Sequence, residues 1–552
     1  MPETLKHQPD MTMQPTEPTK QQYCLQRLLC IKGVGANDTL FAVLLKSASP
    51  ECFAAVLFAF ALALSAYFAV KFLSLPILES YGFRQTQTAL TTLFLMKNGF
   101  SFAYWTPVVG QGWSIPFEFP IYQQITALVT ACLGTPLAET GRMVSWVFNL
   151  LCCIPAWCFL TLYQVDRKTK LFVLALFLSS PLYLFWGSTF MIESTALFFS
   201  LSFVYYAAKI VRRAPGTADY LLAFLFLTLA LLQKATTVLP VALIFVGFFS
   251  FCVVTLADFQ RNKLYLFKTF CTVTLAVIIG YAWVKYSDII KMQNPIGAKL
   301  TSGALMTWNY GSMGQRLSGQ LWNLVFWIRV FSPNLGGYAG IAALLGGLGL
   351  SQDSTRRNLI LVLLAAGFVP FFIFTNLHIV HSYYQTANVF FLIMALGVAV
   401  TTVGDRLLGK WPLAYGALLA IFIISNIYHF GIDGLKLKST PINVTNNLAM
   451  KTAAYVKAHT NEDQTVAWYG FDWSSEPVFY AERKSLAVPE WDDFPLDTIR
   501  HTDKYLTVPP AAIVLCPTKS KDQIREAIIN KYGAIKPEAV GECEIYLTAK
   551  KD

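Results

Sequence analysis

The feature that most constrains this chain is a series of long apolar runs. A helix needs about 20 predominantly apolar residues to cross the hydrocarbon core of a bilayer. The sequence therefore predicts a polytopic α-helical membrane protein with about 11 transmembrane helices. The expected spans are 51–75, 143–163, 170–186, 192–210, 219–233, 237–257, 267–285, 336–350, 358–375, 387–403 and 412–430.

The composition agrees with a membrane location. Only 14% of the 552 residues are charged and 55% are hydrophobic, whereas about 25% of an ordinary soluble domain is charged. In a membrane protein, a basic excess such as the formal net charge of +11 usually marks cytoplasmic loops and contacts to anionic headgroups. We expect membrane lipids as partners and no nucleic acid.

The positions of Lys and Arg predict the orientation. With eleven spans, the basic clusters fall on the side of the N-terminal segment, which the positive-inside rule makes cytoplasmic. These clusters are 166–170, 209–213, 261–268, 356–357 and 405–410. Residues 1–50 lack a signal-peptide pattern, so the first span is expected to be an uncleaved anchor. The segments expected on the outer side are 76–142, 187–191, 234–236, 286–335, 376–386 and the tail, 431–552.

The tail has the pattern of a small α/β domain. Residues 450–459 and 521–532 are predicted to be helices. The predicted strands are 464–469, 511–516 and 542–548. Most of the 11 cysteines lie in apolar runs, but Cys516 and Cys543 lie in the tail. These two could form a disulfide if the tail is extracytoplasmic.

Polar residues are concentrated in the first outer loop, 76–142, where polar groups beside a bilayer are costly unless they are functional. Glu118 lies among aromatic residues next to Pro120, a setting that suits a general base. Alternatively, Glu118 caps the helix that begins near Pro120. Residues 120–134 are too short to span the membrane and are predicted to form an interfacial helix. Glu79 is a second candidate base, or only a helix-end carboxylate at the interface.

Arg84 precedes a second expected interfacial helix, 88–97. Its guanidinium is suited to phosphate because it can donate two parallel hydrogen bonds. Alternatively, its side chain reaches out to lipid headgroups. The neighbouring amides of Gln85 and Gln87 are candidates for binding the substrate.

Two charged residues at the outer ends of later spans are further candidates. Glu193 begins the fourth span, where it could act as a second carboxylate, bind the acceptor or cap the helix. Lys234 lies between two spans, where a cation suits a lipid phosphate or a headgroup.

The last candidate segment contains two of the six histidines. His378 and His381 are three residues apart and precede Tyr383, Tyr384 and Gln385. A histidine pair can bind a metal, but tetrahedral sites need three or four protein ligands and no companion ligand is identifiable. Contacts to phosphate and sugar are therefore favoured; no cofactor is expected, and a divalent metal is possible but not indicated.

These motifs resemble the GT-C superfamily of integral-membrane glycosyltransferases, in particular the bacterial branch related to protein O-mannosyltransferases and the aminoarabinose transferase of lipid A. The resemblance rests on Gly82-Phe-Arg84-Gln85-Thr-Gln87-Thr88-Ala, Glu118-Phe-Pro-Ile-Tyr122-Gln123, the Glu193 segment and His381-Ser-Tyr383-Tyr384-Gln385. It also covers the layout of a long first outer loop and an outer C-terminal domain.

The resemblance implies that an acidic residue of the first outer loop activates the acceptor for inverting transfer from a polyprenyl-phosphate sugar. Relatives often have Asp where this chain has Gln87, so the base is expected to be Glu118 or Glu79, with Glu193 as a competitor. Arg84, Lys234, His378, His381, Tyr383 and Tyr384 are expected at the donor phosphate. Gln85, Gln87, Tyr122, Gln123 and Gln385 are expected at the substrate.

We therefore expect a glycosyltransferase of the bacterial inner membrane, with its active site facing the periplasm and with a lipid, glycan or protein as acceptor. One alternative is a transporter or flippase of a lipid-linked sugar, but the inverted repeats that favour such a protein are not found. The other is a polymerase or ligase of surface polysaccharide, which usually has its large catalytic loop late in the chain.

Overall fold

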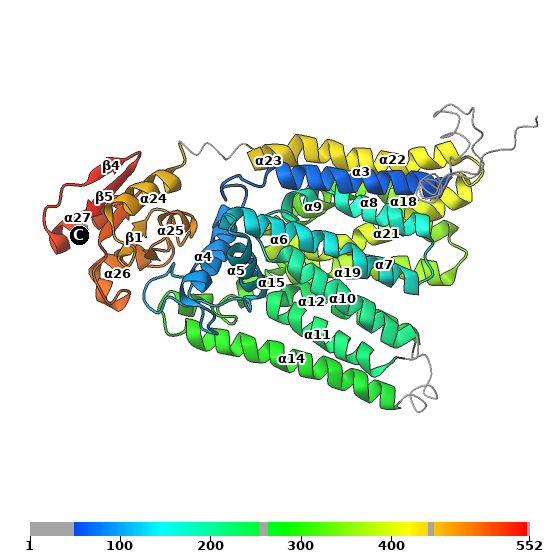
Figure 1. Cartoon of the computed structure of the whole chain (residues 1–552), viewed down its shortest axis with the longest axis horizontal. Coiled ribbons are helices and arrows are strands. Elements are labelled where there is room, and N and C mark those ends of the chain that lie inside the picture. The colour runs from blue at the N-terminus through cyan, green and yellow to red at the C-terminus, as the bar shows by residue number, and fades with distance from the viewer. Residues whose placement is uncertain (1–48, 213–214, 253–262, 440–445, 549–552) are drawn as a thin grey trace, which may run out of the picture.

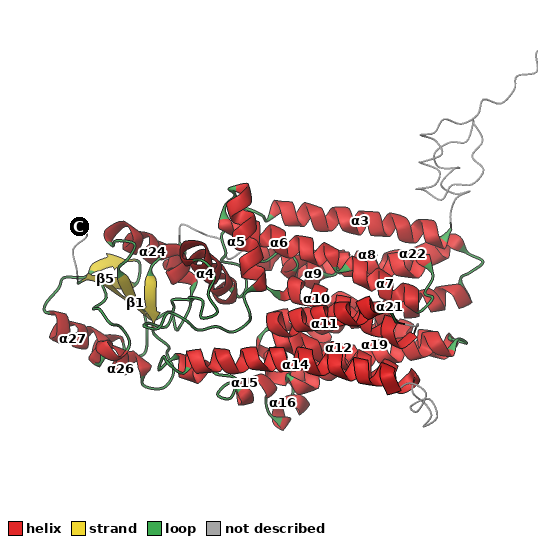
Figure 2. Ribbon diagram, turned by 60° about the horizontal axis from the view of Figure 1, so that its bottom comes forward, coloured by secondary structure: helices red, strands yellow, loops and turns green. Residues whose placement is uncertain are grey.

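The structure is a computed structural model that describes residues 49–212, 215–252, 263–439 and 446–548. The helices form an elongated bundle, and the domain built from the tail lies at one end of it (Figure 1). The strands lie at that same end, next to α4 (Figure 2). The expected cytoplasmic segment, 1–50, lies outside the described residues except for its last two positions.

The helical bundle accounts for all of the expected spans. Its helices are α3 (Pro50–Lys71), α6 (Leu137–Leu151), α7 (Cys153–Leu162), α8 (Arg167–Ser179), α9 (Pro181–Trp186), α10 (Glu193–Arg212), α11 (Thr217–Lys234), α12 (Val238–Cys252), α14 (Lys263–Lys291), α18 (Gly337–Leu350), α19 (Ser354–Ile373), α21 (Thr386–Leu407) and α22 (Pro412–His429). Each expected span overlaps one or two of these helices, although residues 253–257 of one span lie outside the described residues.

Eight helical stretches of the described chain are long and apolar enough to cross a membrane. The expected span 219–233 and the first part of 237–257 fall in one of these stretches, Thr217–Gly247, as α11 and the first part of α12. The expected span 336–350 is the short apolar helix α18, and 170–186 is divided between α8 and α9. The chain is thus a polytopic membrane protein, and a count of eleven spans stays a prediction.

The break between α8 and α9 has a local cause. Pro181 cannot donate a backbone hydrogen bond and prefers the first turn of a helix. Ser180 before it is extended, with ψ 131°. The Oδ1 atom of Asn334 accepts hydrogen bonds from the Ser180 hydroxyl, at 2.6 Å, and from the Leu182 amide, at 3.1 Å. These bonds pair polar groups that the break between the two helices would otherwise leave without a hydrogen-bond partner inside the bundle.

Helix α21 is the centre of the bundle, because its residues are buried on every side from Thr386 to Thr402. Small residues allow its close packing. A Cβ at Gly397 would collide with Val173 of α8, and one at Gly367 of α19 would collide with Leu392 of α21. A helix that is apolar all round is expected in such a position.

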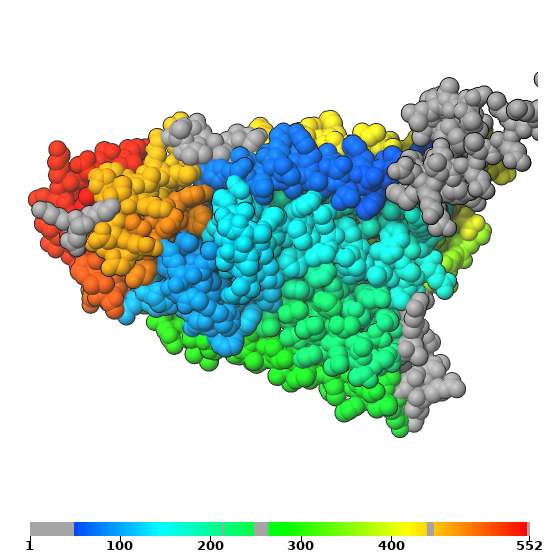
Figure 3. Space-filling view, viewed as in Figure 1, coloured from blue at the N-terminus to red at the C-terminus, as the bar shows by residue number. Residues whose placement is uncertain are grey.

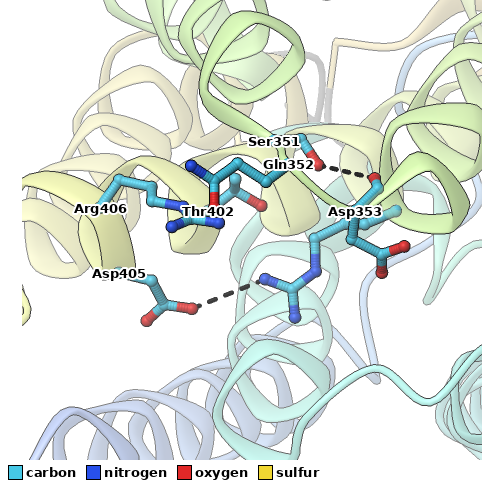
Figure 4. Close-up of a pocket in the computed structure, with 7 residues that line it drawn as sticks. Ser351, Gln352, Asp353, Thr402, Asp405 and Arg406 are labelled. Carbon is cyan, nitrogen blue, oxygen red and sulfur yellow. Dashed lines mark hydrogen bonds and ion pairs between the residues drawn. The ribbon is translucent and has the colours of Figure 1, made fainter.

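The end of the bundle remote from the tail holds a network of ion pairs. Lys168 lies 2.9 Å from Asp405, and Arg356 lies 3.0 Å from Asp166 and 3.6 Å from Asp405. These contacts confirm that three connections predicted on the same side do meet. A cavity of about 290 Å³ lies beside the network, lined by Ser351, Gln352, Asp353, Arg356, Thr402, Asp405 and Arg406 (Figure 4).

The other end of the bundle, which we call the site end, carries short helices between the spans. They are α4 (Gly82–Asn98), α5 (Ile121–Leu133), η1 (Ala235–Thr237), η2 (Gly297–Leu300), α15 (Met306–Tyr310), α16 (Met313–Leu317), η3 (Gln320–Phe331), α17 (Ser332–Leu335), α20 (Thr375–Val380) and η4 (Ser382–Gln385). Helices α4 and α5 confirm the two short helices predicted in the first outer loop. The expected loop 286–335 is instead largely helical, and η3 is a π-helix.

The tail forms an α/β domain, and each of its predicted helices and strands is confirmed. Its elements are α24 (Leu448–His459), β1 (Thr465–Tyr469), α25 (Glu476–Ala481), β2 (Lys484–Ala487), α26 (Phe494–Arg500), η6 (Thr502–Lys504), β3 (Ala512–Leu515), α27 (Lys521–Tyr532), β4 (Glu538–Val540) and β5 (Cys543–Leu547). The strand order is β2-β1-β3-β5-β4, with β1 parallel to β2 and β3. Strands β4 and β5 pair antiparallel.

The last membrane helix runs past the expected boundary at 431, as η5 (Phe430–Gly434) and α23 (Leu435–Ser439).

The hydrophobic core of this domain includes the first outer loop. Leu90 and Phe94 of α4, and Val108, Val109 and Ile115 after it, belong to the same buried cluster as the strands. The blue and orange surfaces of these two segments meet directly in Figure 3. The tail therefore completes its core with residues that lie more than 300 positions earlier in the sequence.

A disulfide joins Cys516, after β3, to Cys543, in β5, as predicted from the sequence. Replacing both residues with Ala is expected to destabilise the domain by about 3 kcal/mol, because the bridge closes a loop of 27 residues in the unfolded chain. Thermal unfolding of the purified protein in detergent would measure this, with the exposed Cys132→Ala as control. Equal midpoints for the two variants would contradict the expectation.

Candidate active site

Glu118 and Arg84 form an ion pair at the site end. The Nη2 atom of Arg84 lies 2.8 Å from Oε2 of Glu118, and Nε2 of Gln123 donates to Oε1 of Glu118 at 2.8 Å. The side chain of Glu118 is 8% exposed and that of Arg84 16%. The other Nη of Arg84 donates to Oε1 of Gln87. Four residues expected from the sequence, Glu118, Arg84, Gln87 and Gln123, therefore meet in one hydrogen-bonded cluster.

The backbone around Glu118 is fixed by groups from three other segments. Its carbonyl accepts from the Tyr104 hydroxyl at 2.7 Å. The amide of Phe119 donates to the carbonyl of Leu232 at 2.8 Å, and the indole of Trp283 donates to the carbonyl of Phe117 at 3.2 Å. Helix α5 begins only at Ile121, and its N-cap, Pro120, makes no side-chain cap hydrogen bond. Glu118 is thus held by tertiary contacts.

Glu193 and Lys234 form a second ion pair. The Nζ atom of Lys234 lies 2.6 Å from Oε1 of Glu193, whose side chain is 2% exposed. The same ammonium lies 4.0 Å from the ring centroid of Tyr384 and 5.1 Å from that of Tyr383. An ammonium over an aromatic face is attracted by the negative charge of the π-system. Lys234 is therefore oriented by contacts within the protein, and a headgroup contact is not needed to explain its position.

The two histidines pack against different neighbours. The ring of His381 stacks on Tyr383, with centroids 5.2 Å apart, and contacts Tyr81. His378 is buried against Phe371, at 4.5 Å. No group of three or more His, Cys, Asp or Glu side chains within the described ranges is arranged to hold a metal ion.

Burial and nearby cations keep both histidines neutral at pH 7. Burial, followed by the charge of Lys234, lowers the pKa of His378 to about 3. Burial lowers the pKa of His381 to about 4, with Lys234, Arg84 and Arg329 acting in the same direction. A neutral imidazole carries one N–H donor and one acceptor. His381 can therefore contribute a hydrogen bond at this site, but not a charge.

Arg329, in the π-helix η3, is a functional candidate that the sequence analysis missed. Its Nη1 donates to the carbonyls of Ile379, at 2.8 Å, and His378, at 3.2 Å. It forms no ion pair with a carboxylate of the described residues. Three cations, Arg84, Lys234 and Arg329, thus act on His381. The sequence signal was a single Arg inside the apolar run Trp327-Ile-Arg-Val, in a segment interpreted as a loop.

Several buried polar atoms of the site have no hydrogen-bond partner in the described part of the chain. They are Nε2 of Gln87, Oε1 of Gln123, Oε2 of Glu193, Nδ1 of His378, Nδ1 of His381 and Oε1 of Gln385. Buried polar groups are normally paired, so each exception calls for an explanation such as water or a bound ligand.

The structure places the other candidates in supporting contacts. Glu79 makes two hydrogen bonds to Arg142, and both side chains are 1% exposed. Burial alone would raise the pKa of Glu79, but Arg142 lowers it overall. Gln85 donates to the Ser80 carbonyl at 3.1 Å and accepts from the Phe190 amide at 3.1 Å. The hydroxyl of Tyr122 donates to the Gly141 carbonyl at 2.7 Å.

With this geometry in place, the chain can be compared with known proteins. No protein-family model matches the sequence. No curated protein matches it by sequence. Solved structures do match. One is ArnT from Cupriavidus metallidurans bound to undecaprenyl phosphate, with a TM-score of 0.59 and 10% identity over 89% of this chain and 98% of that one.

Two further matches are larger membrane proteins. The archaeal oligosaccharyltransferase AglB from Archaeoglobus fulgidus, solved with an inhibitory peptide and a dolichol-phosphate, matches with a TM-score of 0.50 and 10% identity over 83% of this chain and 69% of that one. The arabinofuranosyltransferase AftD from Mycobacteria matches with a TM-score of 0.55 and 12% identity, over 90% of this chain but 40% of AftD. All three are GT-C glycosyltransferases.

This chain has the GT-C fold. The fold predicted from the motifs is therefore confirmed by a comparison that does not depend on them, since the identities are only 10% to 12%. A GT-C fold does not by itself name a donor or an acceptor, because function depends on the site and not on the fold.

Proposed function

We propose that this GT-C protein is an inverting glycosyltransferase that moves a sugar from a polyprenyl-phosphate donor to a hydroxyl group of an acceptor. The observation that carries the proposal is the pairing of Glu118 with Arg84, together with a second cation, Lys234, that lies over the rings of Tyr383 and Tyr384. Burial alone would lower the pKa of Arg84, but the charge of Glu118, with contributions from Tyr383 and Tyr384, raises it overall, so these groups belong to one electrostatic cluster.

In the proposed reaction, the oxygen of the acceptor hydroxyl attacks the anomeric carbon of the sugar. The bond from that carbon to the phosphate oxygen breaks, and its electron pair leaves with the polyprenyl phosphate. Glu118 takes the proton of the acceptor hydroxyl as general base. Each oxygen of Glu118 accepts one hydrogen bond from a side chain. Because a carboxylate oxygen can accept two, a free position remains for the acceptor.

The leaving phosphate needs donors that are in place before it departs. Arg84, Lys234 and Arg329 supply positive charge, and neutral His381 supplies an N–H. The unpartnered atoms of Gln87 and Gln123 are available to sugar hydroxyls. A monophosphate that leaves on a lipid carries less charge than a nucleotide diphosphate, so these side chains can stabilise it without a divalent metal in the proposal.

Glu79 has a different role in this proposal. A carboxylate that makes two hydrogen bonds to a buried guanidinium has little capacity left for a substrate. Arg142 also donates to the carbonyls of Leu75 and Pro76, at 3.2 Å each. We therefore assign Glu79 to holding the start of the first outer loop, and Glu118 to the chemistry.

The finer topology belongs to the same proposal. In this proposal the chain has eleven spans, and Glu118 faces the periplasm of a bacterial inner membrane; the position of the basic clusters at the end remote from the site supports this orientation. The donor's polyprenyl tail would lie between the helices, and the acceptor would be a lipid, a glycan or a protein.

The proposal is tested by incubating the purified protein with radiolabelled polyprenyl-phosphate sugars and candidate acceptors. Release of polyprenyl phosphate together with labelled acceptor supports a transferase. Sugar that crosses a vesicle membrane still attached to its lipid would support the transporter alternative and contradict the proposal.

Arg329→Gln is expected to weaken the binding of undecaprenyl phosphate by about tenfold. A hydrogen bond to a charged group contributes about 1.5–3 kcal/mol, and about 1.4 kcal/mol is tenfold in affinity. The matched control is Arg316→Gln, because Arg316 also donates to backbone carbonyls at the site end, those of Phe372 and Tyr310. Binding is measured by calorimetry in detergent, and an equal loss in both variants would count against a role for Arg329 at the phosphate.

A further inference from the structure

The first turn of α4, which carries Arg84, is held by a side chain from the C-terminal domain. Tyr81, the N-cap of α4, has left-handed backbone angles and makes no side-chain cap hydrogen bond. Instead, the hydroxyl of Ser475 donates to the carbonyl of Phe83 at 2.7 Å. The Phe83 carbonyl belongs to the peptide unit that leads into Arg84. Ser475 thus fixes the backbone directly before the cation.

The contact around Ser475 is tight and fully buried. Oγ of Ser475 lies 3.0 Å from Oγ1 of Thr86, and both residues are 0% exposed. The ring of Trp473 packs against that of Phe83 at 4.9 Å. A Cβ at Gly82 would collide with the carboxylate of Glu476, so glycine there leaves room for that side chain against the first turn of α4. Van der Waals contact and hydrogen bonding therefore both define the position of the turn.

The same domain also holds the segment that leads to Glu118. Residues 107–110 run antiparallel beside β2, the edge strand of the sheet. The Ser485 amide donates to the Pro107 carbonyl at 3.1 Å, and the Ala487 amide donates to the Val108 carbonyl at 2.6 Å. The Gly110 amide donates back to Ser485 at 3.0 Å. The first outer loop is thereby hydrogen-bonded to the edge of the sheet, through an isolated antiparallel bridge between Val109 and Leu486.

Both partners of the Arg84–Glu118 pair are therefore attached to one body, the C-terminal domain. The Ser475 contact holds the backbone before Arg84, and the hydrogen bonds to the edge of β2 hold the chain that leads to Glu118. Groups that act in a reaction must be held close to their productive geometry, and supporting contacts provide this. A displacement of about 1 Å can reduce a rate by as much as about 100-fold.

We propose that Ser475 is a positioning residue for the transfer reaction, acting through the first turn of α4 on Arg84. The C-terminal domain is in this view a part of the active site, although no residue of it is assigned to touch the substrate. The inference rests on the proposed function for its kinetic consequence, but its structural part, the ordering of the turn, is independent of the substrate.

The structural part is tested by hydrogen exchange of the full chain in detergent. The amides of Arg84 and Gln85 donate to the carbonyl of Tyr81, at 3.0 and 3.2 Å, so their exchange reports the order of the turn. Ser475→Ala is expected to speed their exchange by about tenfold or more. The control is Thr498→Ala, which removes a buried hydroxyl of the same domain that bonds Phe494 and Tyr469 and does not contact α4. Equal exchange at Arg84 and Gln85 in both variants would overturn the proposal.

The kinetic part is tested by a double-mutant cycle. Ser475→Ala is expected to lower kcat by about tenfold in the parental protein and to have no further effect in an Arg84→Ala background, because it acts through Arg84. Equal effects in both backgrounds would show a general structural role and overturn the proposal. Thr86→Val, which removes the partner hydroxyl with little change in shape, is expected to act in the same direction and serves if Ser475→Ala does not fold.

The two proposals fail in different ways. If the parental protein transfers sugar from no polyprenyl-phosphate donor, the proposed function is wrong, and hydrogen exchange alone decides whether Ser475 orders the turn. If transfer occurs but Ser475→Ala matches Thr498→Ala in both exchange and kcat, the proposed function stands and the positioning role is wrong.

Discussion

Glu118→Gln is expected to reduce sugar transfer by about 1,000-fold while leaving the protein folded. General base catalysis contributes about 10²–10⁴-fold, and the amide of Gln cannot accept the proton of the acceptor. The amide oxygen can still accept the hydrogen bond from Arg84, at 2.8 Å in the parental pair, so the loop should keep its structure. The measurement is single-turnover transfer with saturating donor.

The control for this prediction is Glu462→Gln. Glu462 also pairs with a cation of α4, Lys97, but its side chain is 70% exposed. Exposed ion pairs contribute only about 0–1 kcal/mol, so this variant should keep nearly full activity. A Glu118→Gln protein that retains more than half of the parental activity would remove Glu118 from the role of base, and Glu193 would become the leading candidate.

Glu79→Gln is expected to act mainly on stability, with a loss of about 3–5 kcal/mol. Breaking a buried ion pair leaves an uncompensated charge away from water, and here the unpaired group would be Arg142, which is 1% exposed. Thermal unfolding in detergent measures the effect. Glu51→Gln, which breaks the exposed pair between Glu51 and Arg167, is the control and should change stability little.

A double replacement separates the two possible roles of Glu79. Glu79→Gln combined with Arg142→Met removes both charges, so part of the stability should return. If Glu79→Gln were as stable as the parental protein but inactive, Glu79 would be a base and our assignment would be wrong.

The same pair predicts a pH dependence of stability. Burial alone would raise the pKa of Glu79, but Arg142 lowers it below its ordinary value of 4.5 in the folded protein. The folded state therefore binds this proton less readily than the unfolded state, and stability rises with pH where the unfolded state holds more protons. The contribution should be complete above about pH 4.5 and should be lost as pH falls through the lowered folded value. Unfolding midpoints measured from pH 7 down to 3 should fall less in the variant with both residues replaced.

Much of the architecture could be predicted because it follows from local patterns. The apolar runs predict helices, since backbone polar groups in a bilayer must be satisfied within the segment. The alternation of short apolar runs and amphipathic segments in the tail predicted its helices and strands. Cys516 and Cys543 could be paired because they were the two cysteines of the polar tail, which was expected on the outer side of the membrane.

The candidate site could be predicted only in part. Glu118, Arg84, Gln87 and Gln123 were found by their unusual position beside a bilayer, and the structure brings them together. Their partners could not be found in this way. Nothing in the sequence near Glu79 indicates Arg142, which lies 63 positions later, and Arg329 was hidden in a segment interpreted as a loop.

The sequence by itself determined that this chain is a membrane protein, that its long apolar stretches are helical, and that the polar residues of the first outer loop are unusual beside a bilayer. These properties depend on hydrophobicity and periodicity, which are read along the chain. The tertiary structure alone decided which carboxylate meets which cation, because pairing depends on contacts between distant segments. It also decided that the first outer loop at Arg84 and Glu118 is completed by the C-terminal domain, through the buried hydroxyl of Ser475 and the edge of β2.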